Sequence, residues 1–260
     1  MSEASYVLRR GTVEAAFCDV EALLRGPRTR ILNDVRRAAV AVVEGPDGPL
    51  VLKRFRDDTP LRLAVALALG PGAERVWRAT RLLLDRGFAV PEPVATLERR
   101  RFGLPLRSCF VARFVSGPTL GELWHRRRGA ARRALTIAFA DWLRDLHAAG
   151  LYPQDLRAAN VLVAAENPAV FVLVDLDRVR RYRRLSWRRR RKNVVQVHRS
   201  VGREAPRRES MRFLRRYLGA PSSAELRRIA AEIVALGKRK DAEYARRRQR
   251  AAAPAAAGRT

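Results

Sequence analysis

The chain has 260 residues, 47% of them hydrophobic, and its 54 Lys and Arg residues against 26 Asp and Glu residues give a formal net charge of +28. The hydrophobic content excludes a chain that is disordered throughout, and two cysteines with three histidines exclude a disulfide scaffold and a Cys/His zinc site. The charge indicates an anionic partner, namely nucleic acid, an anionic membrane surface or a phosphate-bearing substrate, without choosing among them.

The first residues of the chain lack the basic and apolar regions of a signal peptide. The longest apolar run, residues 63–69, is far shorter than the ~18 residues that a membrane-spanning helix needs. We therefore expect a cytoplasmic protein.

The N-terminal part of the chain predicts strands around one helix. Residues 37–43 and 49–55 flank the turn signal Gly-Pro-Asp-Gly and predict a hairpin with Lys53 on its second strand. Lys53 is the only lysine before Lys192 in an arginine-rich chain, which singles it out. Residues 73–86 predict a helix that Gly87 ends, and residues 94–98 and 108–115 predict another strand pair.

A Ser-Gly-Pro break at 116–118 separates this part from a mostly helical one. Thr119 and Glu122 form a capping-box pattern, and residues 131–149 show the clearest helical periodicity. Two short apolar strands, a basic segment and two further helices follow, at 161–163, 170–174, 178–192, 208–218 and 223–236. The sequence predicts an α+β fold with a small mixed N-lobe (1–116), a mostly helical C-lobe (117–237) and a basic, Ala-rich, disordered tail (238–260).

Three polar residues after the long helix carry the chemistry. Asp155 follows the helix in a loop, Asn160 opens a strand five residues later, and the next hairpin returns Asp175. Phosphoryl transfer requires such a set, because one carboxylate accepts the proton of the attacking hydroxyl while an amide oxygen and another carboxylate hold Mg²⁺ against the phosphates of ATP. A structural aspartate that caps a turn gives the same short pattern, so these residues do not decide the function alone.

The sequence segments around these residues point to one kinase family. The segments GFAVPEPVA, LHAAGLY, DLRAANVLV, LVDLDRVR and LSWRRR-x-KNVV resemble the lipopolysaccharide kinase family (Kdo/WaaP type, InaA-like), within the protein-kinase-like fold. The resemblance implies an ATP-dependent kinase, with its active site in the cleft between lobes, that phosphorylates heptose or Kdo of the lipopolysaccharide inner core. It implies Asp155 as catalytic base, Asn160 and Asp175 as Mg²⁺ ligands, and Lys53 as the phosphate-contacting lysine paired with Glu74. Asp177 assists the metal or, as we favour, pairs with an arginine.

Two departures from the family pattern are visible. Pro153 and Gln154 stand where many relatives have His-Arg or His-Lys before the catalytic aspartate, which predicts a weakened support for that loop. The place of a glycine-rich phosphate loop, residues 31–37, contains no glycine, although Arg36 or Arg37 can compensate. A degenerate, inactive kinase is therefore an alternative.

The basic segment after Asp177 is the candidate for docking an anionic substrate or membrane, against the alternative of a solvated face. Its proposed docking residues are Arg183, Arg184, Arg188, Arg189 and Arg190. The partners expected are inner-core glycolipid and the anionic inner-membrane surface, with the protein peripheral on the cytoplasmic face.

Two other functions are alternatives. One is a kinase for protein or another small molecule, although no A-P-E signature follows the basic segment. The other is a nucleic-acid-binding protein, but the sequence has no groove-reading motif, so we expect only non-specific binding to nucleic acid.

Overall fold

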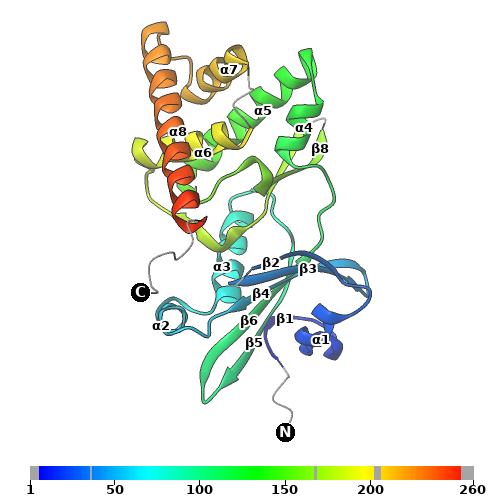
Figure 1. Ribbon diagram of the computed structural model, residues 1–260. Helices are drawn as coiled ribbons and strands as arrows, with labels where there is room; N and C mark the ends of the chain where they lie inside the picture. The colour runs from blue at the N-terminus through cyan, green and yellow to red at the C-terminus, as the bar shows by residue number, and fades with distance from the viewer. Residues whose placement is uncertain (1–5, 36, 167–168, 202–205, 253–260) are drawn as a thin grey trace, which may run out of the picture. The chain divides into compact units, whose positions relative to one another are not determined.

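A computed structural model of the chain describes residues 6–35, 37–166, 169–201 and 206–252, which belong to two compact units (Figure 1). The first unit runs to Gly117 and also includes Leu162–Arg180. The second unit contains Pro118–Val161 and the chain from Arg181 onward. The chain first passes between units at Gly117–Pro118, inside the predicted break. The segment Leu162–Arg180, expected in the C-lobe, instead belongs to the first unit.

The first unit is built on a six-stranded antiparallel sheet of order β1-β5-β6-β4-β3-β2. Its strands are β1 (Val7–Gly11), β2 (Arg30–Val35), β3 (Ala38–Gly45), β4 (Gly48–Arg56), β5 (Pro93–Arg101) and β6 (Leu104–Arg113). Both predicted hairpins are present: Gly45 lies opposite Gly48, and Phe102 and Gly103 turn the second one with φ of 50° and 77°. Positive φ at both central residues matches the right-handed twist of the strands.

Short helices and a further hairpin complete this unit. They are η1 (Ala15–Cys18), α1 (Val20–Arg25), α2 (Pro60–Leu69), α3 (Gly72–Leu84), β8 (Val161–Glu166), β9 (Ala169–Leu173) and η3 (Leu176–Arg178). One core cluster forms where Tyr6 and the η1–α1 segment pack on the sheet, with Tyr6, Val20, Leu52, Leu97 and Val111 all buried.

The start of α3 is fixed against β4 by a close approach. A Cβ on Gly72 would lie 2.3 Å from the ring of Phe55, so no larger residue fits there without displacing the ring. The amide of Gly72 donates to Asp57 Oδ2 at 3.3 Å, and burial raises the pKa of Asp57. This contact places α3 beside the strand that bears Lys53.

The second unit is mostly helical, as predicted. Its helices are α4 (Leu120–Arg126), α5 (Gly129–Ala148), η2 (Ala158–Asn160), α6 (Trp187–Val201), α7 (Arg207–Leu218) and α8 (Ser223–Ala252), with the short strand β7 (Leu151–Pro153). The predicted capping box is present, since Thr119 Oγ1 accepts from the Glu122 amide at 3.2 Å and Glu122 Oε2 accepts from the Thr119 amide at 2.8 Å. A further short strand, β10 (Val179–Arg181), lies where the chain re-enters this unit.

The C-terminal helix is longer than expected. Residues 238–252, which we expected to be disordered, continue α8, whereas 253–260 lie outside the described residues. Alanine and arginine are strong helix formers, and Glu243 pairs with Lys240 and Arg247 at helical spacings, which stabilises this segment. Among the described residues, no helix has the length and apolar character required to cross a bilayer.

Candidate active site

Lys53 lies in the middle of the sheet of the first unit. Its strand β4 is flanked by β3 and β6, and Lys53 is opposite Val40 on one side and Phe110 on the other. Its Nζ lies 2.5 Å from Asp175 Oδ1 and 2.5 Å from Asp177 Oδ1. The first unit thus brings the predicted phosphate-binding lysine and the predicted metal-binding aspartate into direct contact.

The partner predicted for Lys53 from the sequence is wrong. Glu74, in the first turn of α3, forms a two-bond ion pair with Arg10 of β1, with distances of 2.8 and 2.9 Å, and lies 3.6 Å from Arg78. Strand β1 carries no clear pattern in the sequence, so the arginine that takes Glu74 was not foreseen. Lys53 is instead neutralised by the two aspartates that follow β9.

Asp177 pairs with a lysine and with an arginine. Besides Lys53, its second oxygen lies 3.5 Å from Arg37 Nη2. The predicted arginine partner is therefore present, whereas Arg36 lies outside the described residues. Of the region expected to hold a phosphate loop, 31–37, residues 31–35 belong to strand β2.

Asp175 has an unusual backbone conformation. Its φ of 62° and ψ of 61° place it in the left-handed region, which a residue with a Cβ adopts at a cost of about 1–3 kcal/mol. Such conformations persist only where the surrounding structure requires them, and they cluster at functional sites. Here the conformation turns the chain between β9 and η3 and directs both carboxylates to Lys53.

The second unit holds the other two predicted site residues in one loop. Asn160 Nδ2 donates to the main-chain oxygen of Asp155 at 3.0 Å, which leaves its Oδ1 as the oxygen available to a ligand. The Asp155 carboxylate accepts from Arg157 Nε at 2.8 Å through Oδ1 and is partly exposed. The loop therefore presents one carboxylate oxygen and one carboxamide oxygen.

A buried polar network supports this loop from α6, and the sequence alone did not predict it. Asn193, fully buried in α6, donates to the carbonyl of Pro153 at 2.7 Å, and Gln196 donates to the carbonyl of Gln154 at 2.8 Å. These bonds use main-chain oxygens, so they do not require the His-Arg pair of other relatives. The expected weakness of the loop is thereby offset. An asparagine directly before the valines of α6 was the available signal.

His147 continues the network to α7. Its Nε2 is 3.0 Å from Asn193 Oδ1 and its Nδ1 is 2.7 Å from Tyr217 Oη, while Arg190 Nε donates to the same Tyr217 oxygen at 2.9 Å. An amide oxygen only accepts, so the partners assign the proton to Nε2 and let Nδ1 accept from Tyr217. Burial lowers the pKa of His147 to about 4.

We expect stability to fall as the pH drops below about 6.5. The unfolded chain binds a proton at His147 with the ordinary pKa of 6.5, whereas the folded chain does so only at about 4. Stability contributed by neutral His147 is thus complete above 6.5 and is lost progressively towards 4. From pH 7 to pH 5, the free energy of unfolding of the wild type should therefore fall by about 2 kcal/mol more than that of His147→Gln, as measured by urea denaturation.

The matched control for that measurement is His125→Gln on the exposed end of α4, which should keep the wild-type pH slope. Burial also lowers the pKa of His198, so some pH dependence should remain in the His147 variant. Identical slopes for wild type and His147→Gln would contradict the neutral, buried state of His147.

The structure divides the proposed docking arginines into two groups. Arg183, Arg184 and Arg188 are exposed. Arg189 lies over the Tyr182 ring at 4.0 Å, and Arg190 bonds Tyr217. The last two are used within the fold, so only the exposed three remain available to an anionic ligand.

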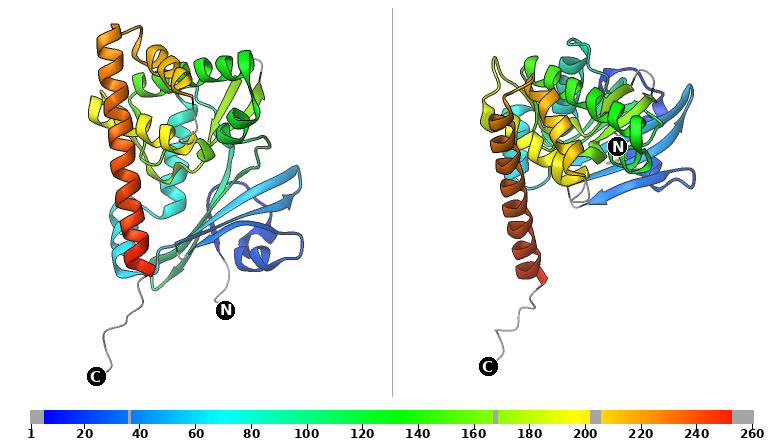
Figure 2. Two further views of the ribbon diagram at one scale, coloured as in Figure 1. Left: turned by 45° about the horizontal axis from the view of Figure 1, so that its top comes forward. Right: turned by 90° about the horizontal axis from the view of Figure 1, so that it is seen from above.

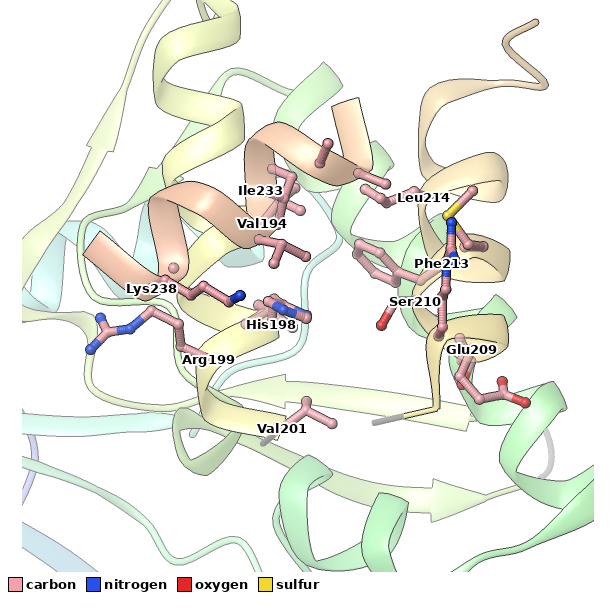
Figure 3. Close-up of a pocket in the computed structure, with 18 of the residues that line it drawn as sticks. Val194, His198, Arg199, Val201, Glu209, Ser210, Phe213, Leu214, Ile233 and Lys238 are labelled. Carbon is pink, nitrogen blue, oxygen red and sulfur yellow. The ribbon is translucent and has the colours of Figure 1, made fainter. Parts of the chain in front are cut away.

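The second unit also contains a large apolar cavity, which Figure 3 shows. Its volume is about 1030 Å³, and it lies between α5, α6, α7 and α8. Val194, Phe213, Leu214 and Ile233 line it, and His198 and Lys238 stand at one side. A cavity of this size and lining suits an extended hydrocarbon chain.

The antiparallel unit bearing Lys53 and the helical unit bearing the Asp155–Asn160 loop are the parts of a protein-kinase-like enzyme. The model of the lipopolysaccharide kinase (Kdo/WaaP) family matches residues 62–217. This match covers more than half of the chain, so the chain belongs to that family, and the predicted resemblance and kinase activity are confirmed.

One curated relative and one solved structure are similar to this chain. The lipopolysaccharide core heptose(I) kinase WaaP of Pseudomonas aeruginosa is 29% identical over 194 residues, which are 69% of this chain and 71% of that protein. A solved structure, WaaP in complex with acyl carrier protein, aligns with a TM-score of 0.61 and 24% identity over 90% of this chain and 99% of that one. The second likeness concerns the fold alone, and it confirms the predicted α+β, protein-kinase-like class.

Proposed function

We propose that this kinase transfers the γ-phosphate of ATP to a sugar hydroxyl, heptose or Kdo, of the lipopolysaccharide inner core. The observation that carries the proposal is the contact of Lys53 with Asp175 and Asp177, because it couples a phosphate-binding cation to the carboxylate of the metal loop. The family and its heptose kinase relative support the acceptor class. We place the enzyme on the cytoplasmic face of the inner membrane, where ATP and the nascent glycolipid meet.

The residues of the chain have distinct roles in this mechanism. Lys53 holds the phosphates of ATP. Asp177, which also pairs with Arg37, keeps the ammonium group of Lys53 in place. Asp155 accepts the proton of the attacking hydroxyl on Oδ2, because Arg157 occupies Oδ1. Asn193 and Gln196 hold the loop through its carbonyls, so the carboxylate is oriented before the substrate arrives.

Magnesium fits the donor set of this proposal. Asp175 supplies a carboxylate and Asn160 a carboxamide oxygen, and hard oxygen ligands are those that Mg²⁺ prefers. Among the described residues, no group of three or more His, Cys, Asp and Glu side chains forms a complete metal site. The protein would therefore supply two ligands, with ATP phosphates and water as the others. The bound ion would neutralise charge that develops on the transferred phosphoryl group.

Phosphate transfer from γ-labelled ATP to isolated inner-core glycolipid tests the proposal. The wild type should label an acceptor that lacks the core phosphate and leave a fully phosphorylated core unlabelled. Labelling of a generic protein acceptor, with none of the glycolipid, would favour a protein kinase instead.

The three exposed arginines of the basic segment should set the affinity for the glycolipid. We expect replacement of Arg183, Arg184 and Arg188 by glutamine to raise KM for the acceptor about tenfold at unchanged kcat, because lost exposed ion pairs cost about 0.2–1 kcal/mol each. The matched control removes the same charge from α8 with Arg246, Arg247 and Arg248 changed to glutamine. Equal KM values for the two triple variants would contradict a local docking role.

We also propose that the apolar cavity receives the acyl chain of an acyl carrier protein. The solved complex of WaaP with acyl carrier protein suggests the partner, and the cavity lined by Val194, Phe213 and Ile233 supports it. Acylated carrier protein should co-elute with the enzyme in size-exclusion chromatography, and the unacylated form should not. Equal binding of both forms would exclude the cavity as the recognition element.

A further inference from the structure

Helix α2 of the first unit is apolar and faces solvent. Its sequence is PLRLAVALAL, with Arg62 as its only charged residue. Leu61 is 78% exposed, Leu67 60% and Leu69 51%, whereas only Ala66 is fully buried against the unit. Such an apolar helix face in contact with water is unfavourable unless a partner covers it.

A second exposed apolar residue lies at the same end of the sheet as α2. Asp57, three residues before α2, donates its amide to the carbonyl of Leu106 of β6 at 2.9 Å, and Phe102, at the tip of the β5–β6 hairpin, precedes Leu106 by four residues. Phe102 is 89% exposed. Figure 1 and the left view of Figure 2 show α2 and this tip at the same end of the sheet. Leu61, Leu67, Leu69 and Phe102 form what we term the α2–hairpin surface.

Cations border this surface. Arg75 Nη1 donates to the carbonyl of Gly70 at 2.6 Å, and Arg78 donates to the carbonyl of Leu69, so two guanidinium groups stand at the C-terminal end of α2. At the hairpin tip, Arg101 lies over the Phe102 ring at 5.3 Å, and Arg100 is exposed beside it. Apolar side chains bordered by guanidinium groups complement a bilayer with anionic headgroups, which accepts both.

We propose that the α2–hairpin surface docks onto an anionic lipid bilayer, with α2 lying in the plane of the headgroups. The choice of a bilayer over a protein partner rests on the proposed function, because the acceptor of that reaction is a membrane-anchored glycolipid. The inserted leucines would hold the first unit at the surface where the acceptor sugars project. The exposed guanidinium groups of Arg78 and Arg101 would contact lipid phosphates.

Vesicle sedimentation tests this docking without any catalytic readout. Wild-type protein should pellet with vesicles of phosphatidylethanolamine and phosphatidylglycerol, and much less with phosphatidylcholine alone or in high salt. Leu61→Gln with Leu67→Gln should weaken binding to the anionic vesicles by about tenfold or more, since both leucines lose apolar contact with lipid. Phe102→Asn, which suits the positive φ of that turn, should weaken it further.

The control changes two exposed apolar residues elsewhere in the same unit, Val7→Gln with Leu8→Gln on β1. Both double variants keep the net charge, and the control should bind vesicles as the wild type does. Wild-type binding by the α2 double variant, or no binding by the wild type, would overturn the proposal. A wild-type dimer that Leu61→Gln with Leu67→Gln converts to a monomer, without lipid binding, would assign the surface to a second copy of the chain.

The kinase assay separates this proposal from the proposed function. With detergent-dispersed glycolipid, the α2 double variant should transfer phosphate at the wild-type rate, whereas with glycolipid embedded in vesicles it should be slower. Loss of vesicle binding with both rates unchanged would overturn the docking role while leaving the kinase function intact. Absence of transfer by the wild type in both formats would reject the function and leave the sedimentation result standing.

Discussion

Replacing Asp155 with asparagine is expected to lower phosphoryl transfer by about 10³-fold, which corresponds to about 4 kcal/mol of lost transition-state stabilisation. Asparagine has the same shape but cannot accept the proton of the attacking hydroxyl. The bond from Asn160 Nδ2 goes to the main-chain oxygen of residue 155, so the loop keeps its geometry in the variant. Steady-state kinetics with saturating ATP and glycolipid measure the effect.

The matched control for this prediction is Asp145→Asn. Asp145 is an exposed carboxylate on α5, paired with Arg144 at 3.6 Å, so its replacement removes the same charge away from the loop. The control should keep full activity, and thermal unfolding of both variants should match the wild type. If Asp155→Asn kept more than about a tenth of the wild-type rate, the assignment of the base would fail.

Lys53→Arg is expected to lower phosphoryl transfer by at least about 10²-fold, or about 2.7 kcal/mol. The charge is kept, but a planar guanidinium cannot occupy the position that the compact ammonium takes, 2.5 Å from both Asp175 and Asp177. Its donors would therefore meet the phosphates in the wrong place. Turnover of ATP and thermal unfolding of the purified variant should be measured together, and unfolding should change little.

Two comparison variants sharpen this test. Lys240→Arg makes the same substitution on exposed α8 and should be silent. Glu74→Gln should cost less than tenfold, because Glu74 pairs with Arg10 and Arg78 and not with Lys53. Full activity of Lys53→Arg, or a loss in Glu74→Gln as large as in Lys53→Arg, would contradict the arrangement described above.

The sequence predicted the elements whose local chemistry is strong. The Gly-Pro-Asp-Gly turn defined the β3–β4 hairpin, and the Thr119–Glu122 pair defined the start of α4, because turn and cap residues act within a few positions. The loop of Asp155 and Asn160 was recognisable for the same reason, since its residues are close in sequence. Lys53 was distinguishable only because lysine is so rare in this chain.

The features that the sequence did not predict depend on contacts between segments far apart in the chain. Edge strands β1 and β2 are exposed throughout, so they lack the alternation that marks a half-buried strand. Without β1, the sequence offered Lys53 as the partner of Glu74, whereas the fold supplies Arg10. The support of the loop by Asn193 is likewise invisible in the sequence, because it joins residues forty positions apart.

Phosphorylation of a lipopolysaccharide core sugar by this chain should depend on Asp155. The most direct measurement is the mass of an inner-core glycolipid, isolated without its core phosphate, after incubation with ATP, Mg²⁺ and purified enzyme. We expect the wild type to add one phosphoryl group per acceptor and Asp155→Asn to add none over the same time. An unmodified acceptor with the wild type, or equal modification by both proteins, would contradict the proposed reaction or the role of Asp155 in it.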